Sequence, residues 1–256
     1  MVTLIQEQNS FPGITNKILA NKVNKICVAY PEMEKYFPKE KILMTGNPIR
    51  QDIQCVEGKR EKGLQTFGLS NDKKTILVIG GSLGALTINE SIAKCLDAFE
   101  KNNIQLVWQT GKGYFEKAKQ VVQKYETKGI KAFDFIQKMD EAYAVADIVV
   151  SRAGASSVSE LCVVKKTCIL IPSPNVAEDH QTKNAMALVN KNAAVLVKDT
   201  EARETLCTEV LSLIKDVVRC EELSKNIEQL AFKDSAMVKI GRASCRARVS
   251  LSVVAV

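Results

Sequence analysis

The stretch "DIVVSRAGASSVSEL" at residues 147–161 joins a short apolar run to a segment with helical spacing. An apolar strand that leads directly into a helix is the repeating unit of a parallel sheet covered by helices on both faces. The residues that join the two, 152–157, are small except for Arg152. This stretch therefore predicts an α/β fold with a compact turn at the carboxyl end of one strand.

The start of that helix has two interpretations. Ser157 and Glu160 have the spacing of a capping box, in which both side chains satisfy free backbone N–H groups. Alternatively, the small side chains let a ligand approach the backbone, the helix N-terminus holds an anion, and Glu160 accepts hydrogen bonds from hydroxyls. One helix start can serve both purposes.

The same alternation extends on both sides of the quoted stretch. Continuous apolar runs predict strands at 74–82, 104–111, 130–136, 147–154 and 167–173, separated by helical segments, with a further apolar run at 193–199 and two helices beyond it. We therefore expect a complete doubly wound parallel-sheet domain over residues 73–237. Ligands of such sheets bind at the carboxyl ends of the strands.

The remaining segments differ in character. Residues 1–56 contain short strands, an amphipathic helix and turns, and the charged, glycine-bearing residues 57–72 are expected to be a linker. Residues 240–256 have no period and no acidic residue, and they resemble a translated sequencing adaptor, so we expect a non-native tail. Removing the three arginines of that tail from the net charge of +7 leaves +4.

Composition excludes several classes of protein. A hydrophobic fraction of 46% and a charged fraction of 25% are typical of a globular protein, and no run is long enough to span a membrane. The eight cysteines form no C-x-x-C pair, and the chain has one histidine, so a zinc site is not expected. Cys27 and Cys168 lie in apolar runs and are expected to be reduced core residues. No basic stripe with interleaved aromatics indicates nucleic-acid binding.

The loops after the predicted strands carry the chemistry. "GGSLGA" at 80–85 follows the first strand of the large domain, and glycines there allow a phosphate to approach the backbone. The G-x-G-x-x-G spacing of nicotinamide-dinucleotide sites is absent. These loops offer Gly, Ser, Gln, Asn and Glu without a Ser-His-Asp arrangement, which favours recognition of hydroxyls and phosphates.

Several motifs occur together in one order: "IQEQNSFPGITNKILA", "GNPIR", "GGSLGALTINE", "FDFIQKMDEAYAVADIVVSRAGASSVSEL" and "DHQTKNA". With them the chain resembles the MurG family over residues 2–237. The resemblance implies a two-domain GT-B glycosyltransferase fold. It also implies inverting, metal-independent transfer of GlcNAc from UDP-GlcNAc to the lipid-linked muramyl-pentapeptide of peptidoglycan biosynthesis. No cofactor is implied, and the expected location is peripheral, at the cytoplasmic face of the bacterial plasma membrane.

The resemblance also assigns roles to residues. It places Asn9 at the donor sugar, Arg50 near the nucleotide, Ser82 at a phosphate and the backbone of Ile136 at the uracil edge. The helix start would enclose the ribose and diphosphate, with Glu160 on the ribose hydroxyls and Gln181 on the GlcNAc hydroxyls. The expected binding residues are Asn9, Arg50, Ser82, Ile136, Ala155, Ser156, Ser157, Val158, Ser159, Glu160 and Gln181. The catalytic base is left open, as is whether His180 or Gln181 contacts the sugar.

Structural alternatives exist for these residues. Asn9 could cap the turn at Pro12–Gly13, Arg50 could be a surface charge, Ser82 could cap a helix and Ile136 could belong to the core.

Family members begin with a glycine-rich "GGxGGH" loop, which does not occur here. We therefore expect residues 1–56 to be the last part of a truncated N-terminal acceptor domain, and the chain alone to be inactive. A donor-binding module without turnover and an enzyme like UDP-GlcNAc 2-epimerase are the alternatives. The single histidine argues against the epimerase.

Overall fold

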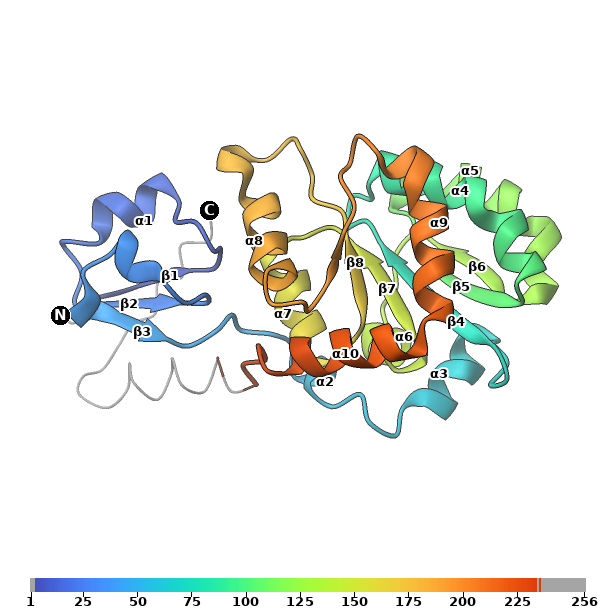
Figure 1. Ribbon diagram of the computed structural model, residues 1–256, viewed down its shortest axis with the longest axis horizontal. Coiled ribbons are helices and arrows are strands. Elements are labelled where there is room, and N and C mark those ends of the chain that lie inside the picture. The colour runs from blue at the N-terminus through green and yellow to red at the C-terminus, as the bar shows by residue number, and fades with distance from the viewer. Residues whose placement is uncertain (1–2, 234, 236–256) are drawn as a thin grey trace.

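The computed structural model describes residues 3–233 and 235, which form two parallel sheets with flanking helices (Figure 1). The smaller sheet has the order β1-β2-β3. Its strands are β1 (Leu4–Glu7), β2 (Lys25–Val28) and β3 (Ile42–Met44), accompanied by α1 (Ile14–Leu19) and the 3-10 turns η1 (Met33–Lys35) and η2 (Lys39–Lys41). The helix that follows, α2 (Gln51–Gln54), packs instead on the larger sheet, where Ile53 is part of the core. Ile26 and Val28 of the central strand lie in a small core.

The larger sheet has six parallel strands in the order β6-β5-β4-β7-β8-β9. They are β4 (Lys74–Ile79), β5 (Ile104–Gln109), β6 (Ile130–Phe133), β7 (Ile148–Ser151), β8 (Cys168–Leu170) and β9 (Val195–Leu196). The apolar runs of the sequence are buried because helices cover both faces of the sheet. The predicted doubly wound fold is confirmed.

Two apolar cores lie on opposite faces of this sheet. One contains side chains of α4 (Leu86–Lys101), α5 (Lys112–Val122) and α9 (Ala202–Lys215). The other contains side chains of α6 (Met139–Val145), α7 (Ala155–Val163) and α8 (His180–Val189). The helix α10 (Val217–Glu228) contributes Leu223 to the first core and Ile227 to the second. Two further 3-10 turns are η3 (Gln123–Lys128) and η4 (Ala177–Asp179).

The segment expected to be a linker contains a packed helix, α3 (Arg60–Phe67). Phe67 is buried and meets the ring of Phe133 edge-on at 5.5 Å. Arg60 donates to the carbonyl of Val145 at 2.8 Å, and a side chain at Gly63 would come within 2.6 Å of a backbone oxygen of α6. The middle of the segment 57–72 is therefore held against α6 rather than extended between two units.

The direction in which successive strands are added to the sheet reverses at β4. From β4 the chain builds outward through β5 and β6, and then returns to add β7, β8 and β9 on the other side. Because β4 pairs with β7, the loops that follow these two strands are neighbours. Such a reversal is where ligands of open α/β sheets bind.

Other expectations have mixed outcomes. Cys27 and Cys168 are buried, as expected. The tail proposed at 240–256 lies outside the described residues. Within the part of the chain that the structure describes, no helix has both the length and the apolarity to span a membrane.

Candidate functional site

The glycine loop after β4 is packed against the end of β5. Gly84 has φ +80°, and a Cβ there would lie 2.0 Å from the carbonyl oxygen of Thr110. Backbone therefore packs directly on backbone, which only glycine allows. Ser82 and Leu83 stand exposed at the tip of the loop. The helix α4 begins at Leu86 without a side-chain cap, so the alternative of Ser82 as a cap is wrong.

The serine-rich turn after β7 leads into α7, whose N-cap residue is Gly154. Ser157 is the third residue of the helix, and no side chain caps the helix start, so the capping-box interpretation is wrong. The N–H groups of Ala155, Ser156 and Ser157 precede the first intrahelical bond, from Val158 to Gly154, and have no helical partner. Small side chains surround these three N–H groups, which have no partner among the described residues, at the positive end of a helix dipole.

Glu160 lies one turn further along α7. The hydroxyl of Tyr143 donates to its Oε2 at 3.0 Å. Burial raises the pKa of the Glu160 carboxyl, while the bond from Tyr143 and the positive charge of Arg50 act in the opposite direction. One carboxylate oxygen is held by Tyr143, and the other has no hydrogen-bond partner among the described residues.

Arg50 lies at the surface, as the structural alternative expected. Its side chain is 49% exposed, and its Nε lies 3.4 Å from Oδ1 of Asp52. Its positive charge acts to lower the pKa values of Glu160 and Tyr143. Arg50 is thus a surface residue whose charge acts on Glu160 of α7.

Ile136 follows β6 and has a buried side chain, as the structural alternative expected. Its N–H donates to Oε1 of Gln109 at 2.9 Å. Its carbonyl accepts no hydrogen bond from the described residues. Of the backbone groups expected to face a uracil, only this carbonyl is available.

Asn9 bridges the two sheets. Its Oδ1 accepts from Nδ2 of Asn184 on α8 at 3.0 Å, and its backbone N–H donates to Glu7 at 3.0 Å. The turn at Gly13 is held by Oε2 of Glu7, so the alternative in which Asn9 caps it is wrong. Sequence analysis missed Glu7 and Asn184, although both lie inside motifs that it quoted.

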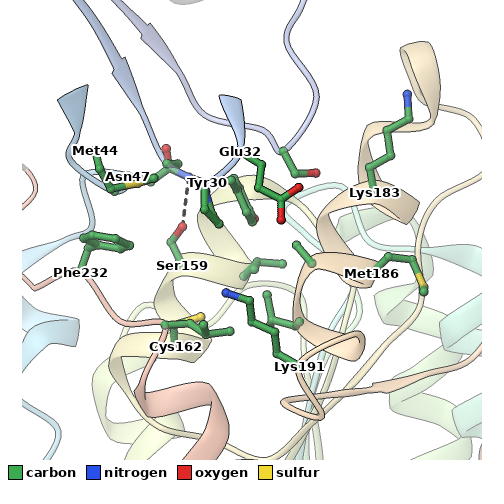
Figure 2. A pocket seen from close by; sticks show the side chains of 18 of the residues that line it. Tyr30, Glu32, Met44, Asn47, Ser159, Cys162, Lys183, Met186, Lys191 and Phe232 are labelled. Carbon is green, nitrogen blue, oxygen red and sulfur yellow. Dashed lines mark hydrogen bonds between the residues drawn. The ribbon is translucent and has the colours of Figure 1, made fainter. Parts of the chain in front are cut away.

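Of the predicted residues of α7, two side chains face protein rather than the sheet edge. Val158 is buried, and the Ser159 hydroxyl donates to the carbonyl of Ala155 at 2.9 Å and accepts from Asn47 at 3.0 Å (Figure 2). Asn47 also donates to the carbonyl of Gln8 at 2.9 Å. Val158 and Ser159 therefore support the helix start instead of lining it.

Gln181 and His180 begin α8. The Oε1 of Gln181 accepts from the backbone N–H of Ser173 at 2.9 Å, and its amide NH₂ has no partner in the part of the chain that the structure describes. The His180 ring lies 6.2 Å from that of Phe11, and its Nδ1 is buried without a partner among the described residues. Gln181 is thus held with free donors, whereas His180 is packed into an aromatic contact.

A cavity of about 720 Å³ lies between the loops of the small sheet and helices α7 and α8 (Figure 2). Its walls include Tyr30, Met44, Met186 and Lys191. Of the predicted binding residues it includes only Val158 and Ser159, whereas Ser82, Ile136 and Glu160 lie outside it. This cavity is therefore distinct from the predicted site, which is an open edge at the reversal of the strand order.

The arginine of the opening stretch has a structural role. Arg152 pairs with Asp199 at 2.5 Å and donates to the carbonyls of Ile171 and Pro172 at 3.1 Å each. Thr87 at the start of α4 donates to the other oxygen of Asp199 at 3.0 Å. This network ties together the loops around the site.

Comparisons with known proteins agree on one family. A family model described as "Glycosyltransferase family 28 C-terminal domain" matches residues 75–238. A relative from Parabacteroides distasonis is 55% identical over 233 residues, covering 91% of this chain and 63% of the relative. One from Bacteroides fragilis is 52% identical over 238 residues, covering 92% and 63%. Both are named UDP-N-acetylglucosamine–N-acetylmuramyl-(pentapeptide) pyrophosphoryl-undecaprenol N-acetylglucosamine transferase.

Solved structures extend the likeness of fold. The crystal structure of Acinetobacter baumannii MurG superposes with a TM-score of 0.74 at 24% identity, covering 94% of this chain and 67% of that chain. A UDP-N-acetylglucosamine 2-epimerase reaches a TM-score of 0.58 at 11% identity, covering 94% and 64%. The fold is therefore common to a transferase and an epimerase, so the likeness of fold does not distinguish between these two activities.

The resemblance to the MurG family is confirmed by these relatives, although the chain spans only 63% of their length. The family model covers more than half of the chain. The chain belongs to the glycosyltransferase family 28 C-terminal domain family.

Proposed function

We propose that the chain binds UDP-GlcNAc at the carboxyl edge of the six-stranded sheet. The observation that carries this proposal is the juxtaposition of two open loops at the strand-order reversal. One is the glycine loop at 80–85, and the other is the uncapped start of α7. Free backbone N–H groups at a helix N-terminus suit a diphosphate.

The residues around this edge suit the rest of the donor. Glu160 has a free carboxylate oxygen for ribose hydroxyls, and the carbonyl of Ile136 can accept from a uracil ring N–H. Gln181 presents amide donors for the GlcNAc hydroxyls, with Asn9 nearby through Asn184. Ser82, Ala155, Ser156 and Ser157 would surround the diphosphate, while Arg50 adds positive charge. Val158 and Ser159 would act through their position in α7.

The reaction proposed is the one in the names of the relatives: transfer of GlcNAc to the lipid-linked muramyl-pentapeptide, without a metal or cofactor. The leaving group of this transfer is UDP, which gains negative charge as the glycosidic bond breaks. The N–H groups and dipole of α7 would stabilise that charge in place of a metal ion. We assign no catalytic base.

We propose that the chain divides into an acceptor-side unit (1–56), a connecting segment (57–72) and a UDP-GlcNAc-binding domain (73–237).

We also propose peripheral contact with the inner face of the plasma membrane, because the acceptor named for the relatives carries undecaprenol. Ile14 and Ile18 of α1 are 65% and 62% exposed and offer apolar side chains for such contact.

Calorimetric titration with UDP-GlcNAc tests the donor site. We expect binding at one site and competition by UDP, and a folded chain that binds neither would contradict the proposal. Because the chain alone is expected to be inactive, the reaction is tested with a version extended to the full length of the relatives, labelled UDP-GlcNAc and the lipid-linked acceptor in vesicles. Label on the muramyl sugar supports the transferase, whereas labelled UDP-ManNAc would favour the epimerase instead.

A further inference from the structure

Two glutamines on β5 are both buried, four residues apart on the same face of the strand. Gln105 lies at the amino end and is 1% exposed; Gln109 lies at the carboxyl end and is 2% exposed. A buried amide must find hydrogen-bond partners, and each of these finds them in a different place. Gln105 binds the segment that precedes the sheet, whereas Gln109 binds the loops of the candidate site.

Gln109 joins the loops that follow the strands on either side of β5. Its Nε2 donates to the carbonyl of Gly81 in the glycine loop at 3.2 Å. Its Oε1 accepts from the N–H of Ile136, in the loop after β6, at 2.9 Å. The carbonyl of Gly81 also accepts from the N–H of Gly84 at 3.1 Å, so the same atom closes the turn of the glycine loop.

These two bonds fix the orientation of the amide. The Gly81 carbonyl is an acceptor and the Ile136 N–H is a donor. If the Gln109 amide were rotated by half a turn, its oxygen would face the carbonyl and its NH₂ would face the N–H. The N–H of Ile136 is occupied, and its carbonyl is the polar backbone group left for a ligand.

We propose that Gln109 is a positioning residue that sets the nucleobase preference of the site. This inference rests on the proposed function, because it concerns the base of the nucleotide that the proposed site binds. A carbonyl at Ile136 selects a base whose ring nitrogen carries a hydrogen, as N3 of uracil does. The corresponding nitrogen of cytosine is an acceptor and would face another acceptor. With Gln109 in place, the loop offers only the carbonyl; without it, the N–H of Ile136 becomes available to cytosine.

The experiment compares UDP and CDP binding to the whole chain by calorimetry. For Gln109→Leu we expect weaker UDP binding and a UDP-over-CDP preference reduced by about tenfold, the size of one lost hydrogen bond. Gln109→Glu keeps the acceptor for Ile136 but faces the Gly81 carbonyl with a second acceptor. It should therefore weaken binding of both nucleotides while retaining more of the base preference than Gln109→Leu.

Gln105→Leu is the matched control. Gln105 accepts from the N–H of Ser70 at 2.6 Å and donates to its carbonyl at 2.8 Å, far from the candidate site. This variant should lower the melting temperature but leave the ratio of UDP to CDP affinity unchanged. A general loss of stability would affect both variants, whereas a change in base preference should follow Gln109 alone.

One measurement needs no variant. The Ile136 amide of the unmodified chain should exchange its hydrogen slowly, because Gln109 holds it. Rapid exchange would overturn the inference. It would also be overturned if folded Gln109→Leu kept the UDP-over-CDP ratio of the unmodified chain, or if the two Gln109 variants had equal ratios. If the unmodified chain binds UDP but the ratio does not respond, the inference fails alone. If it binds no UDP at all, the proposed function fails with it.

Discussion

The two edges of the six-stranded sheet use similar residues in opposite ways. At the amino edge, polar groups satisfy one another. Asp147 accepts from the Thr75 N–H at 2.8 Å and from Lys74 at 3.2 Å, and Lys166 donates to the carbonyl of Ala146 at 2.7 Å. At the carboxyl edge, α4 and α7 begin without side-chain caps. The amino edge thus uses its polar groups within the protein, whereas the first N–H groups of α7, at the edge where we propose the donor site, have no partner among the described residues.

The two glutamines of β5 show the same contrast between the amino and carboxyl edges within one strand. Gln105 also donates to the hydroxyl of Thr75 at 3.2 Å, so its amide is used entirely within the protein scaffold. Gln109 supports loops whose own polar groups remain open. In the proposed site, a buried polar side chain would thus hold the ligand-binding backbone in place without touching the ligand.

The largest effect is expected for Gly84→Ala. A methyl group there meets the Thr110 carbonyl oxygen at 2.0 Å, and φ +80° is unfavourable for alanine. Strain and overpacking together should lower the free energy of unfolding by about 3 kcal/mol. Gly58→Ala is the control, since Gly58 has φ +76° with nothing within 4 Å and should cost only about 1 kcal/mol. Urea unfolding of both variants checks this, and equal losses would show that the close approach at the loop is unimportant.

Next in size is Gln105→Leu at the amino edge. It leaves the backbone N–H and carbonyl of Ser70 without their partner, which should cost about 2–3 kcal/mol of unfolding free energy. UDP affinity of the folded protein should stay the same, as measured by calorimetry well below the melting temperature. A large drop in affinity would break the proposed separation between the two edges.

Glu160→Gln, at the carboxyl edge, should have the opposite outcome: stability is kept and UDP-GlcNAc affinity falls. Its amide oxygen can still accept from Tyr143, so the fold should be retained. Loss of the charged acceptor for ribose hydroxyls should raise the Kd for UDP-GlcNAc by about 10- to 100-fold, the worth of a charge-assisted hydrogen bond. Unchanged affinity would remove Glu160 from the site.

The smallest effect concerns pH. Burial raises the pKa of Glu160 above that of an ordinary glutamate, and its ionised form is the better acceptor for ribose. UDP-GlcNAc affinity should therefore be full above this raised pKa and fall as the pH drops through it. Tyr143→Phe removes a bond that lowers this pKa, so the midpoint should move to higher pH. The diphosphate of UDP-GlcNAc is doubly substituted and does not titrate in this range, and a midpoint unmoved by the variant would contradict the pairing.

Sequence patterns predicted the alternation of strands and helices because apolar runs report burial directly. They did not predict α3, in which the charged residues Arg60, Glu61 and Lys62 obscure a short buried face that includes Phe67. They also misplaced the start of α7, since Ser157 and Glu160 fit a capping box while the backbone turns at Gly154.

Contacts between distant segments lay beyond the sequence patterns. Gln109 meets Gly81 and Ile136, and Asn184 meets Asn9, across 27 to 175 positions of the chain. No local spacing encodes such pairs. The resemblance to a family supplied candidate ligand residues, but only the fold showed which side chains support them from behind.

The most direct test is an amide-resolved titration of the folded chain with UDP by nuclear magnetic resonance. The account predicts shifts for the amides of the glycine loop at 80–85 and of Ala155, Ser156 and Ser157, with those of Ser70, Thr75 and Asp147 unmoved. Shifts confined to the amino edge or to the walls of the 720 Å³ cavity would contradict it, as would a titration that moves neither loop.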